Sequence, residues 1–269
     1  MDLGIAGKVA IVTGGSHGIG RAISEELGRN GCKVVVAARG QEQMDDTVEA
    51  IESVGGKAAS VSVDLLDFDS YPRMIEAAKS AFGVPEIGIY SPVGPPPGAF
   101  GDFTDEDFDK SFAAVVKGFA NFARAIVPGM KEKQWGRLIT ISSGISKQPA
   151  RRSILHFDYA LANVNRPAAL GLNRTLADEL GPHGITVNSI PPGFIETGEN
   201  YRAFLEECAR RDGLTYEEFM EKERLRIPLQ RFGKPEELSG LCAFLCSKQA
   251  GYITGQCIVV DGGLIDMYF

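Results

Sequence analysis

Short, mostly apolar runs recur along the chain and alternate with longer segments of mixed character. Such runs are typical of parallel strands, which are buried on both faces of a sheet. The mixed segments carry apolar residues at helical spacing and end at turn-forming residues, as helices do. Strands are expected over residues 9–12, 33–38, 58–63, 86–91, 137–142, 184–190 and 256–263.

The mixed segments between these runs predict the helices. Thr104 is expected to cap the long fourth helix, because Asp107 three residues later completes a capping box. Seven buried strands joined by helices predict an α/β fold, with one doubly wound parallel sheet and right-handed crossovers in a single domain, 1–269. Helices are expected over residues 19–30, 41–53, 68–82, 104–131, 157–180, two within 201–226, and 235–247.

A glycine-rich turn, TGGSHGIG, follows the first strand at residues 13–20 and opens the first helix. Glycine lets the backbone turn tightly and approach a phosphate closely, and the start of a helix carries unpaired N–H groups at its positive end. This turn is therefore expected to bind the pyrophosphate of a dinucleotide. The residues expected to do so are Gly14, Ser16, His17, Gly18, Ile19 and Gly20.

Charge and composition exclude several classes of partner. A net charge of −7 argues against nucleic acid, because phosphate neutralisation needs a basic surface. The N-terminal MDLGIAGK lacks the basic and long apolar regions of a signal peptide. No stretch approaches the ~20 apolar residues that span a bilayer, so no membrane partner is expected.

The cysteines indicate a reducing compartment. Their number is odd, their spacing is wide and no C-x-x-C occurs, so buried free thiols and no metal site are expected. A cytoplasmic location follows from this expectation. The five are Cys32, Cys208, Cys242, Cys246 and Cys257.

Besides the glycine turn, the chain contains Asp64 after the third strand, GRLITISS, LADELGPHGITVNSIPPGFIET and ITGQCIVVDGG. Together these segments resemble the short-chain dehydrogenase/reductase family over nearly the whole chain. The resemblance implies a Rossmann-type domain, a nicotinamide cofactor across the carboxyl ends of the strands, and usually a tetramer. It places Asp64 and Leu65 at the adenine. It also places Pro192, Gly193, Ile195 and Thr197 at the nicotinamide end.

The end of the second strand suggests which cofactor is used. Enzymes that prefer NAD usually place an acid there to bind the ribose hydroxyls. This chain has Ala38 followed by Arg39, whose guanidinium can bind a 2′-phosphate through two charge-assisted hydrogen bonds. NADP(H) is therefore expected rather than NAD(H), although Arg39 can also be read as a solvated surface residue.

The active-site motifs depart from the family. Where the main branch has Asn-Asn-Ala-Gly, this chain reads SPVG at 91–94, which keeps only Gly94 for the cofactor. The family asparagine before the helix glycine is replaced by Val115. The ungapped run RPAALGLNRTLADEL places Arg166 on the family lysine and Ala162 on the family tyrosine, so Tyr159-x-x-x-Asn163 is not the motif.

Tyr159 then precedes Arg166 by seven positions, which on a helix returns to nearly the same face. The spacing is similar to Tyr-(x)6-Lys in enoyl-acyl-carrier-protein reductases. Ser143 aligns with the catalytic serine. Ser143, Tyr159 and Arg166 are therefore the expected catalytic residues, with Tyr159 as proton donor and Arg166 both lowering its pKa and holding ribose hydroxyls.

These residues predict an NADP(H)-dependent reductase for a carbonyl, of 3-oxoacyl type or in a cyclic ketone, or for an activated C=C. The alternative is a catalytically silent NADP(H)-binding paralogue that serves as a partner or regulatory subunit. An apolar substrate is expected, because a short helical lid at about 201–228 and the loop 95–100 are rich in apolar residues. The helices 104–131 and 157–180 are rich in small and apolar residues, and in the family that the chain resembles such helices pair across a two-fold axis, so the resemblance implies a homotetramer or homodimer.

A hydrolase is the remaining alternative. Gly14 to Gly18 also fits G-x-S-x-G, the nucleophile elbow of α/β-hydrolases, with Ser16 as nucleophile. That site needs a later histidine, and only His156 and His183 follow. His183 is expected in a turn away from the carboxyl ends of the strands, which disfavours a triad.

Overall fold

The computed structural model describes residues 2–150 and 158–267. Its strands are β1 (Val9–Thr13), β2 (Lys33–Ala38), β3 (Lys57–Ser62), β4 (Ile87–Tyr90), β5 (Gly136–Ile141) and β6 (Ile185–Ile190). Its α-helices are α1 (Gly18–Arg29), α2 (Gln41–Ser53), α3 (Ser70–Phe82), α4 (Asp105–Phe112), α5 (Gly118–Lys133), α7 (Ala160–Leu180), α8 (Glu199–Asp212), α9 (Tyr216–Arg226) and α10 (Pro235–Cys246). Short helical segments are η1 (Phe100–Asp102), η2 (Ala113–Lys117), η3 (Gly144–Ser146) and η4 (Gly181–His183).

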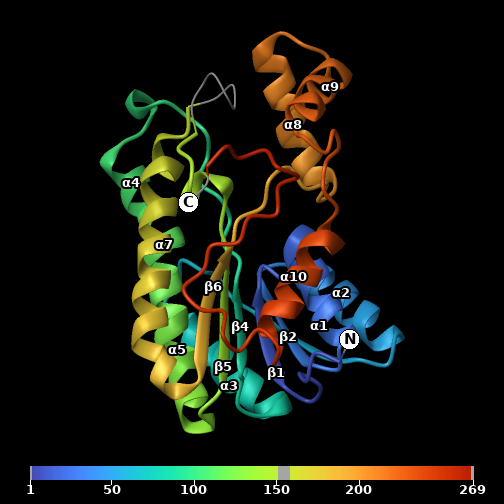
Figure 1. Cartoon of the computed structure of the whole chain (residues 1–269), viewed down its shortest axis with the longest axis vertical. Helices are drawn as coiled ribbons and strands as arrows, with labels where there is room; N and C mark the ends of the chain where they lie inside the picture. Colours follow the sequence, from blue (N-terminus) through green and yellow to red (C-terminus); the bar gives the residue numbers. More distant parts are fainter. Residues whose placement is uncertain (1, 151–157, 268–269) are drawn as a thin grey trace.

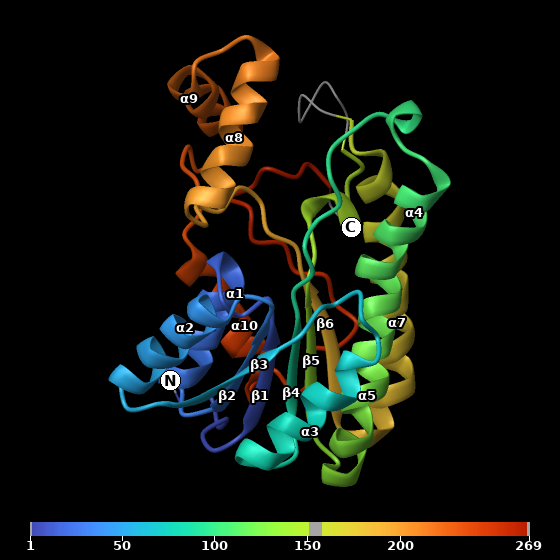
Figure 2. The ribbon, with the colours of Figure 1, turned by 180° about the vertical axis from the view of Figure 1, so that it is seen from behind.

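The strands form one parallel sheet in the order β3-β2-β1-β4-β5-β6, between two layers of helices (Figures 1 and 2). One buried cluster joins the sheet to α1, α2 and α10, and a second joins it to α3, α5 and α7. The expected doubly wound α/β fold is confirmed. The chain direction along the sheet reverses between β1 and β4, and folds of this kind bind ligands at that point, outside the carboxyl ends of the strands.

The sheet has six strands, so the expected seventh is wrong as a regular strand. The segment 256–260 does run beside β6, through bridges of Ser189 with Cys257 and of Pro192 with Val260. Its ladder is irregular because side chains replace backbone partners. Asn188 Oδ1 accepts from the N–H of Gln256 at 3.0 Å, and Pro191 has no N–H to donate to the carbonyl of Ile258.

The expected long helix over 104–131 is divided by the π-helical segment η2. Its start is confirmed, because Thr104 Oγ1 accepts from the N–H of Asp107 at 3.3 Å and Asp107 Oδ2 accepts from the N–H of Thr104 at 2.9 Å. π turns are rare and occur often at functional sites. This one faces the carboxyl end of β4, where Tyr90 contacts it.

The two expected amphipathic helices are α8 and α9, which form a hairpin that stands beyond the carboxyl edge of the sheet (Figures 1 and 2). Leu205, Cys208, Ala209 and Phe219 are buried in a small core of this hairpin. The hairpin is called the lid below. All five cysteines are free; four are buried and Cys257 is half-buried.

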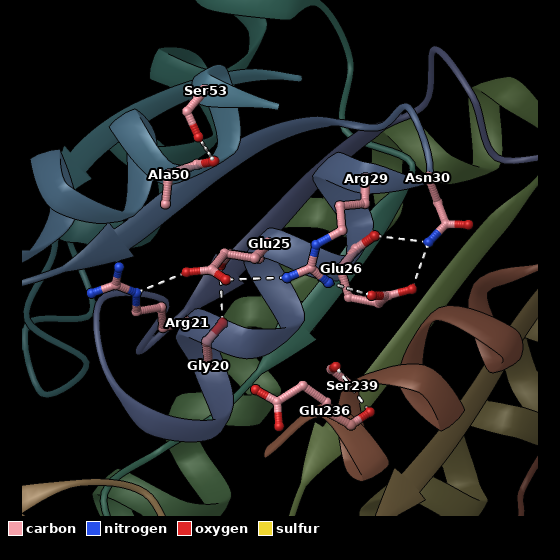
Figure 3. A network of polar contacts seen from close by, with 11 residues as sticks. Gly20, Arg21, Glu25, Glu26, Arg29, Asn30, Ala50, Ser53, Glu236 and Ser239 are labelled. Atoms are coloured by element: carbon pink, nitrogen blue, oxygen red, sulfur yellow. Dashed lines mark hydrogen bonds and ion pairs between the residues drawn. The ribbon is translucent and has the colours of Figure 1, made fainter. Parts of the chain in front are cut away.

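The outer face of α1 carries its own network of polar contacts (Figure 3). Arg21 Nε lies 2.8 Å from a carboxylate oxygen of Glu25, and Arg29 pairs with Glu25 at 3.2 Å and with Glu26 at 2.5 Å. Asn30 Nδ2 donates to the carbonyl of Glu26 at 2.8 Å, near the C-terminus of the helix. These contacts occupy polar groups on the side and at the C-terminal end of α1. None of them uses the N–H groups at its N-terminal end.

Candidate functional site

The turn between β1 and α1 needs its glycines. Gly14 has φ +64° and Gly18 φ +49°, in the left-handed region that favours glycine. A Cβ on Gly20 would overlap the carbonyl oxygen of Gly14, and a Cβ on Gly14 would lie 2.8 Å from the carbonyl oxygen of Ser91. The turn therefore folds onto itself and onto the end of β4, with no room for a side chain at Gly14 or Gly20.

The start of α1 has no capping side chain. His17 is the N-cap residue but makes no capping hydrogen bond, and the first turn contains no acidic residue. Instead, His17 Nδ1 lies 2.9 Å from Oγ of the buried Ser16. Unpaired N–H groups at the positive end of a helix bind phosphate well. The turn therefore fits the expected pyrophosphate site, beside Ile19 and the three glycines.

Hydrogen bonds connect the ends of β1 and β4 at this site. The N–H of Ser91 donates to Thr13 Oγ1 at 2.9 Å, and that hydroxyl donates to the carbonyl of Ile89 at 3.3 Å. The chain then continues to the exposed Gly94, where an added Cβ would lie 3.2 Å from Nη2 of Arg166. The structure thus brings together two of the expected cofactor residues, Gly94 and Arg166.

The loop after β6 closes the site from the other side. A Cβ on Gly18 would lie 2.9 Å from Cβ of Thr197, so Thr197 packs against the glycine turn. Gly193 donates its N–H to the carbonyl of Val260 at 2.9 Å, next to the bridge of Pro192 with Val260. Ile195 is buried. Of the residues expected at the nicotinamide end, Thr197 therefore lies beside the glycine turn, and Pro192 and Gly193 lie beside Val260.

The residues expected at the adenine end follow β2 and β3. Arg39 is exposed and makes no hydrogen bond or ion pair with a described residue. Asp64 is exposed too, and accepts from the N–H of Leu66 at 2.9 Å. Leu65 is half-buried, and its carbonyl accepts from the hydroxyl of Tyr71 at 2.9 Å. Because β1, β2 and β3 are neighbours, these residues lie along the same edge of the sheet as the glycine turn.

Arg166 is a buried cation without a protein partner. Its side chain on α7 is only 6% exposed, and it forms no hydrogen bond or ion pair within the part of the chain that the structure describes. Burial lowers the pKa of its guanidinium to about 10, which leaves it charged at neutral pH. Buried charges in proteins are normally paired. Arg166 therefore needs acceptor atoms from a ligand.

Tyr90 lies beside this cation and was not selected from the sequence. It is 1% exposed, and its hydroxyl donates to the carbonyl of Ala114 in η2 at 2.6 Å. Burial raises the pKa of the phenol well above its usual range, while the charge of Arg166 acts to lower it. The available signal was a tyrosine that ends an apolar strand directly before the altered residues 91–94.

Ser143 lies half-buried after β5 and caps η3, with Oγ accepting from the N–H of Ile145 at 3.4 Å.

Both polar groups of the Asn163 side chain are used in a structural contact. Its Oδ1 accepts from the N–H of Ala150 at 2.8 Å and its Nδ2 donates to the carbonyl of Ala150 at 3.0 Å. Asn163 therefore fastens the loop after β5 to α7 and is no substitute for the family lysine.

Tyr159 lies outside α7, so the expected helical face shared with Arg166 is wrong. It is the N-cap residue, with φ −129° and ψ 50°, and its backbone forms a bridge with Gly98. Its ring packs against the buried core of the lid. Burial raises the pKa of its phenol, and Cys208 and Glu223 of the lid raise it further. A common site for Tyr159 and Arg166 stays a prediction.

A cavity of about 320 Å³ lies between the loop after β6 and the lid. At the edge of this cavity, the guanidinium of Arg202 lies over the ring of Tyr216, 5.0 Å from the ring centroid. Phe100, from the loop that was also expected to contact substrate, is 78% exposed and does not line this cavity. The cavity is lined by Glu196, Thr197, Gly198, Tyr201, Arg202, Leu205, Tyr216, Met220 and Phe232.

The cavity confirms part of the expected apolar lid surface. Tyr201, Leu205, Tyr216 and Met220 face it, whereas Phe219 is buried in the lid core. Sequence reasoning missed Phe232 and the charged residues at the rim, because nothing in their local pattern separates them from an ordinary surface segment. The position of these residues depends on how the lid folds back over residues 196–198.

The geometry disfavours a hydrolase triad. His183 ends η4 directly before β6, at the amino edge of the sheet, and its Nδ1 lies 3.4 Å from Nε2 of Gln134. Ser16 is at the opposite, carboxyl edge. His156 lies outside the described residues. Within 2–150 and 158–267, no group of three or more histidine, cysteine or acidic residues could hold a metal ion, and no helix is long and apolar enough to cross a membrane.

Known proteins share this architecture. The family model described as enoyl-(acyl carrier protein) reductase matches residues 14–265. Human dehydrogenase/reductase SDR family member 4 is 34% identical over 260 residues, which cover 96% of this chain and 88% of that protein.

Two solved structures are similar over nearly their whole length. L-Sorbose reductase from Gluconobacter frateurii, in complex with NADPH and L-sorbose, has a TM-score of 0.91 and 30% identity, covering 99% of this chain and all of that one. A 7α-hydroxysteroid dehydrogenase in complex with NADH and 7-oxo glycochenodeoxycholic acid has a TM-score of 0.86 and 27% identity, covering 100% and 98%. The chain therefore belongs to the short-chain dehydrogenase/reductase family, and is an oxidoreductase of that type.

Proposed function

We propose that this protein is an NADP(H)-dependent reductase of a carbonyl, in a 3-oxoacyl group or a cyclic ketone, or of an activated C=C. The observation that supports it most is Arg166, a buried guanidinium with no partner among the described residues, beside Gly94. Ribose hydroxyls of a dinucleotide would supply the acceptor atoms that this charge needs. The uncapped start of α1 suits the pyrophosphate of the same ligand.

Different residues of the site would bind different parts of the cofactor. The glycine turn would hold the pyrophosphate, Asp64 and Leu65 the adenine, and the loop at 192–197 the nicotinamide end. Bound there, the nicotinamide supplies the hydride. The chain contributes orientation and a proton, for which Tyr159 is the proposed donor. The phenol of Tyr159 is protonated at neutral pH, but burial raises its pKa and so makes it a weaker acid than a solvated tyrosine; the expected lowering of this pKa by Arg166 is not seen in the structure.

The cavity supports an apolar substrate. Its volume of about 320 Å³ lies at the lower end of the range for small-molecule sites, roughly 300–1,000 Å³. The rings of Tyr201, Tyr216 and Phe232 offer flat apolar faces, which suit a ring or an acyl chain. Ser143 would accompany Tyr159 at the reacting oxygen.

NADPH oxidation with a panel of activated ketones and enoyl thioesters tests the function. The unmutated protein is expected to bind NADPH and to oxidise it with at least one member of the panel. Binding without oxidation by any substrate would instead support the silent NADP(H)-binding subunit. Failure to bind NADPH would contradict both.

Arg39 is expected to make NADPH bind at least about tenfold more tightly than NADH, a difference of about 1.4 kcal/mol. Arg39 is exposed and has no partner among the residues that the structure describes, so its guanidinium can take the 2′-phosphate. Calorimetry with both cofactors measures the ratio, and Arg39→Asp should abolish it. Lys57→Asp, the same change of charge at the amino edge of the sheet, is the control and should leave the ratio unchanged. Equal affinities in the unmutated protein would contradict the assignment.

A homotetramer or homodimer is proposed, formed through α4, α5 and α7, which lie side by side on one side of the molecule (Figures 1 and 2). Phe112 and Val164 on these helices are 39% and 56% exposed. Light scattering should give a small multiple of 28.9 kDa, and Val164→Glu should reduce it. Val54→Glu, at the end of α2 with 61% exposure, should not. A monomer at micromolar concentration would reject the proposal.

A cytoplasmic location is proposed as well. All five cysteines are free, and burial raises the pKa of Cys208 to about 12, so this thiol stays protonated and inert. Thiols of this kind suit a reducing compartment. No nucleic-acid or membrane partner is proposed.

A further inference from the structure

Residues 261–266 form a tight turn after the irregular segment beside β6. The carboxylate of Asp261 shapes this turn, because its Oδ1 accepts from the N–H of Gly263 at 2.9 Å and its Oδ2 from the N–H of Ile265 at 2.8 Å. The N–H of Leu264 also donates to the carbonyl of Asp261, at 3.3 Å. These bonds fix the backbone from which the Ile265 side chain projects. The segment is called the Asp261 turn below.

The Asp261 turn packs directly on η3. A Cβ on Gly144 would lie 2.6 Å from Cδ1 of Ile265, so the end of the Ile265 side chain covers the backbone of Gly144. Beside this contact, the N–H of Asp266 donates to Oε1 of Gln148 at 3.1 Å. The Asp261 turn therefore contacts η3 at its first residue and the chain just after its last one.

The same turn contacts two other parts of the site. A Cβ on Gly193 would lie 2.6 Å from Cβ of Asp261, so the loop after β6 packs against the turn with no side chain between them. A Cβ on Gly262 would lie 2.7 Å from Cγ2 of Ile227, directly after α9 of the lid. The N–H of Leu229 donates to the carbonyl of Gly262 at 3.2 Å. One turn thus joins η3, the loop after β6 and the base of the lid.

Ser143, directly before η3, is held only weakly by its own side chain. Its Oγ accepts from the N–H of Ile145 at 3.4 Å, which is longer than the roughly 2.7–3.2 Å of most N–H···O bonds. Gly144 follows it and has no side chain with which to pack. The placement of Ser143 therefore depends on what covers Gly144, and the side chain of Ile265 does so.

We propose that Ile265 is a positioning residue that acts through Ser143, and that the carboxylate of Asp261 holds Ile265 in place. The Asp261 turn packs on Gly193, in the loop assigned to the nicotinamide end, and on η3. It therefore sets the position of the Ser143 hydroxyl relative to that loop. The inference rests on the proposed function, because that function places Ser143 at the reacting oxygen.

Kinetics of Ile265→Ala test this with the best substrate of the panel. The variant should lower kcat about tenfold, because a small misplacement of a reacting group is costly. The Kd for NADPH should stay within about twofold, since Asp261 still packs on Gly193. Ile265→Ala added to Ser143→Ala should lower kcat no further, because the residue through which Ile265 acts is gone. Equal effects in both backgrounds would overturn the proposal.

Asp261→Asn tests the support of Ile265. Asparagine keeps Cα and Cβ against Gly193 but has one acceptor oxygen in place of two, so the N–H of Gly263 or of Ile265 loses its partner. We expect kcat to fall about threefold or more, again only where Ser143 is present. An unchanged kcat would overturn the role of this carboxylate.

Ile253→Ala is the matched control. Ile253 is half-buried, as Ile265 is, but it packs against the cluster that joins the sheet to α1 and α10. The same truncation there should lower thermal stability about as much and leave kcat unchanged. A fall in kcat as large as that of Ile265→Ala would show a general effect of destabilisation and overturn the specific role.

Hydrogen exchange supplies a readout that needs no turnover. The N–H groups of residues 146–148 donate to the carbonyls of Ser143 and Gly144 at 2.9 to 3.1 Å, so their protection reports how firmly η3 is held. Ile265→Ala should speed the exchange of these amides about fivefold or more, and Ile253→Ala should not. Unchanged exchange in a folded Ile265→Ala protein would overturn the proposal.

This readout keeps the inference separate from the proposed function. If the unmutated protein reduces no member of the panel, the proposed function fails, and exchange still decides whether Ile265 holds η3. If the protein is active and Ile265→Ala speeds exchange without lowering kcat, only the role of Ile265 fails. Should Ile265→Ala not fold, Ile265→Val replaces it in both measurements, because valine lacks only Cδ1, the atom that covers Gly144.

Discussion

Tyr159→Phe is expected to lower turnover by roughly 10²-fold or more while NADPH affinity stays nearly constant. Only the phenolic hydroxyl is removed, and the proposed role of that hydroxyl is to donate a proton to the product. The ring can still pack against the lid, so the fold should be preserved. Steady-state kinetics with the best substrate of the panel, together with a direct measurement of NADPH binding, separates the two effects.

Variants of Arg166 complete this test. Arg166→Ala should weaken both turnover and NADPH binding, because it removes a ribose contact together with a positive charge near the site. Arg166→Lys should retain or improve activity, since an ammonium restores the arrangement that the family resemblance implies. Full activity in Tyr159→Phe would show that the donor is another group, with Ser143 or an ordered water next in line.

Gly20→Ala is expected to reduce NADPH affinity by roughly 10²-fold or more and to lower the free energy of unfolding by about 2 kcal/mol. The new Cβ would overlap the carbonyl oxygen of Gly14, which is backbone and cannot swing away. The turn would have to open, and its N–H groups would no longer converge on a phosphate. Calorimetry of NADPH binding and thermal unfolding measure the two losses.

Gly240→Ala is the control for this substitution. Gly240 is an exposed residue of α10, and an added Cβ would have no neighbour within 4 Å. Alanine there should raise stability by about 0.5–1 kcal/mol, because it lowers the entropy of the unfolded chain. A Gly20→Ala protein that binds NADPH normally would refute the pyrophosphate site at this turn.

The strands and helices were predictable because burial imposes a simple periodicity on them. Strands β1 and β6 are buried along their whole length and β2 along its centre, and each expected boundary lies close to the observed one. The last segment was not predictable in detail. Whether residues 256–260 form a regular ladder depends on Asn188 and Pro191, which approach them only in the folded chain.

The residues of the candidate site were also predictable only in part. The glycine turn was predictable because its residues are consecutive and its chemistry follows from backbone geometry. Tyr159 was not, because α7 begins one residue after it and the lid determines where its ring packs. Tyr90 was also hidden, because a tyrosine in a strand signals burial and nothing in its own neighbourhood points to Ala114 or Arg166.

The clamp that Asn163 places on Ala150 has a consequence for engineering. Ala150 is held at its N–H and carbonyl by Asn163, at 2.8 and 3.0 Å, and the carbonyl of Asp158 accepts from the N–H of Gly98 at 2.7 Å. Both anchors are made entirely by residues outside 151–157. Substitutions confined to 151–157 therefore leave both partners of each of these hydrogen bonds unchanged. Libraries limited to these seven positions would diversify the sequence that precedes α7 while the residues that anchor it on either side stay the same.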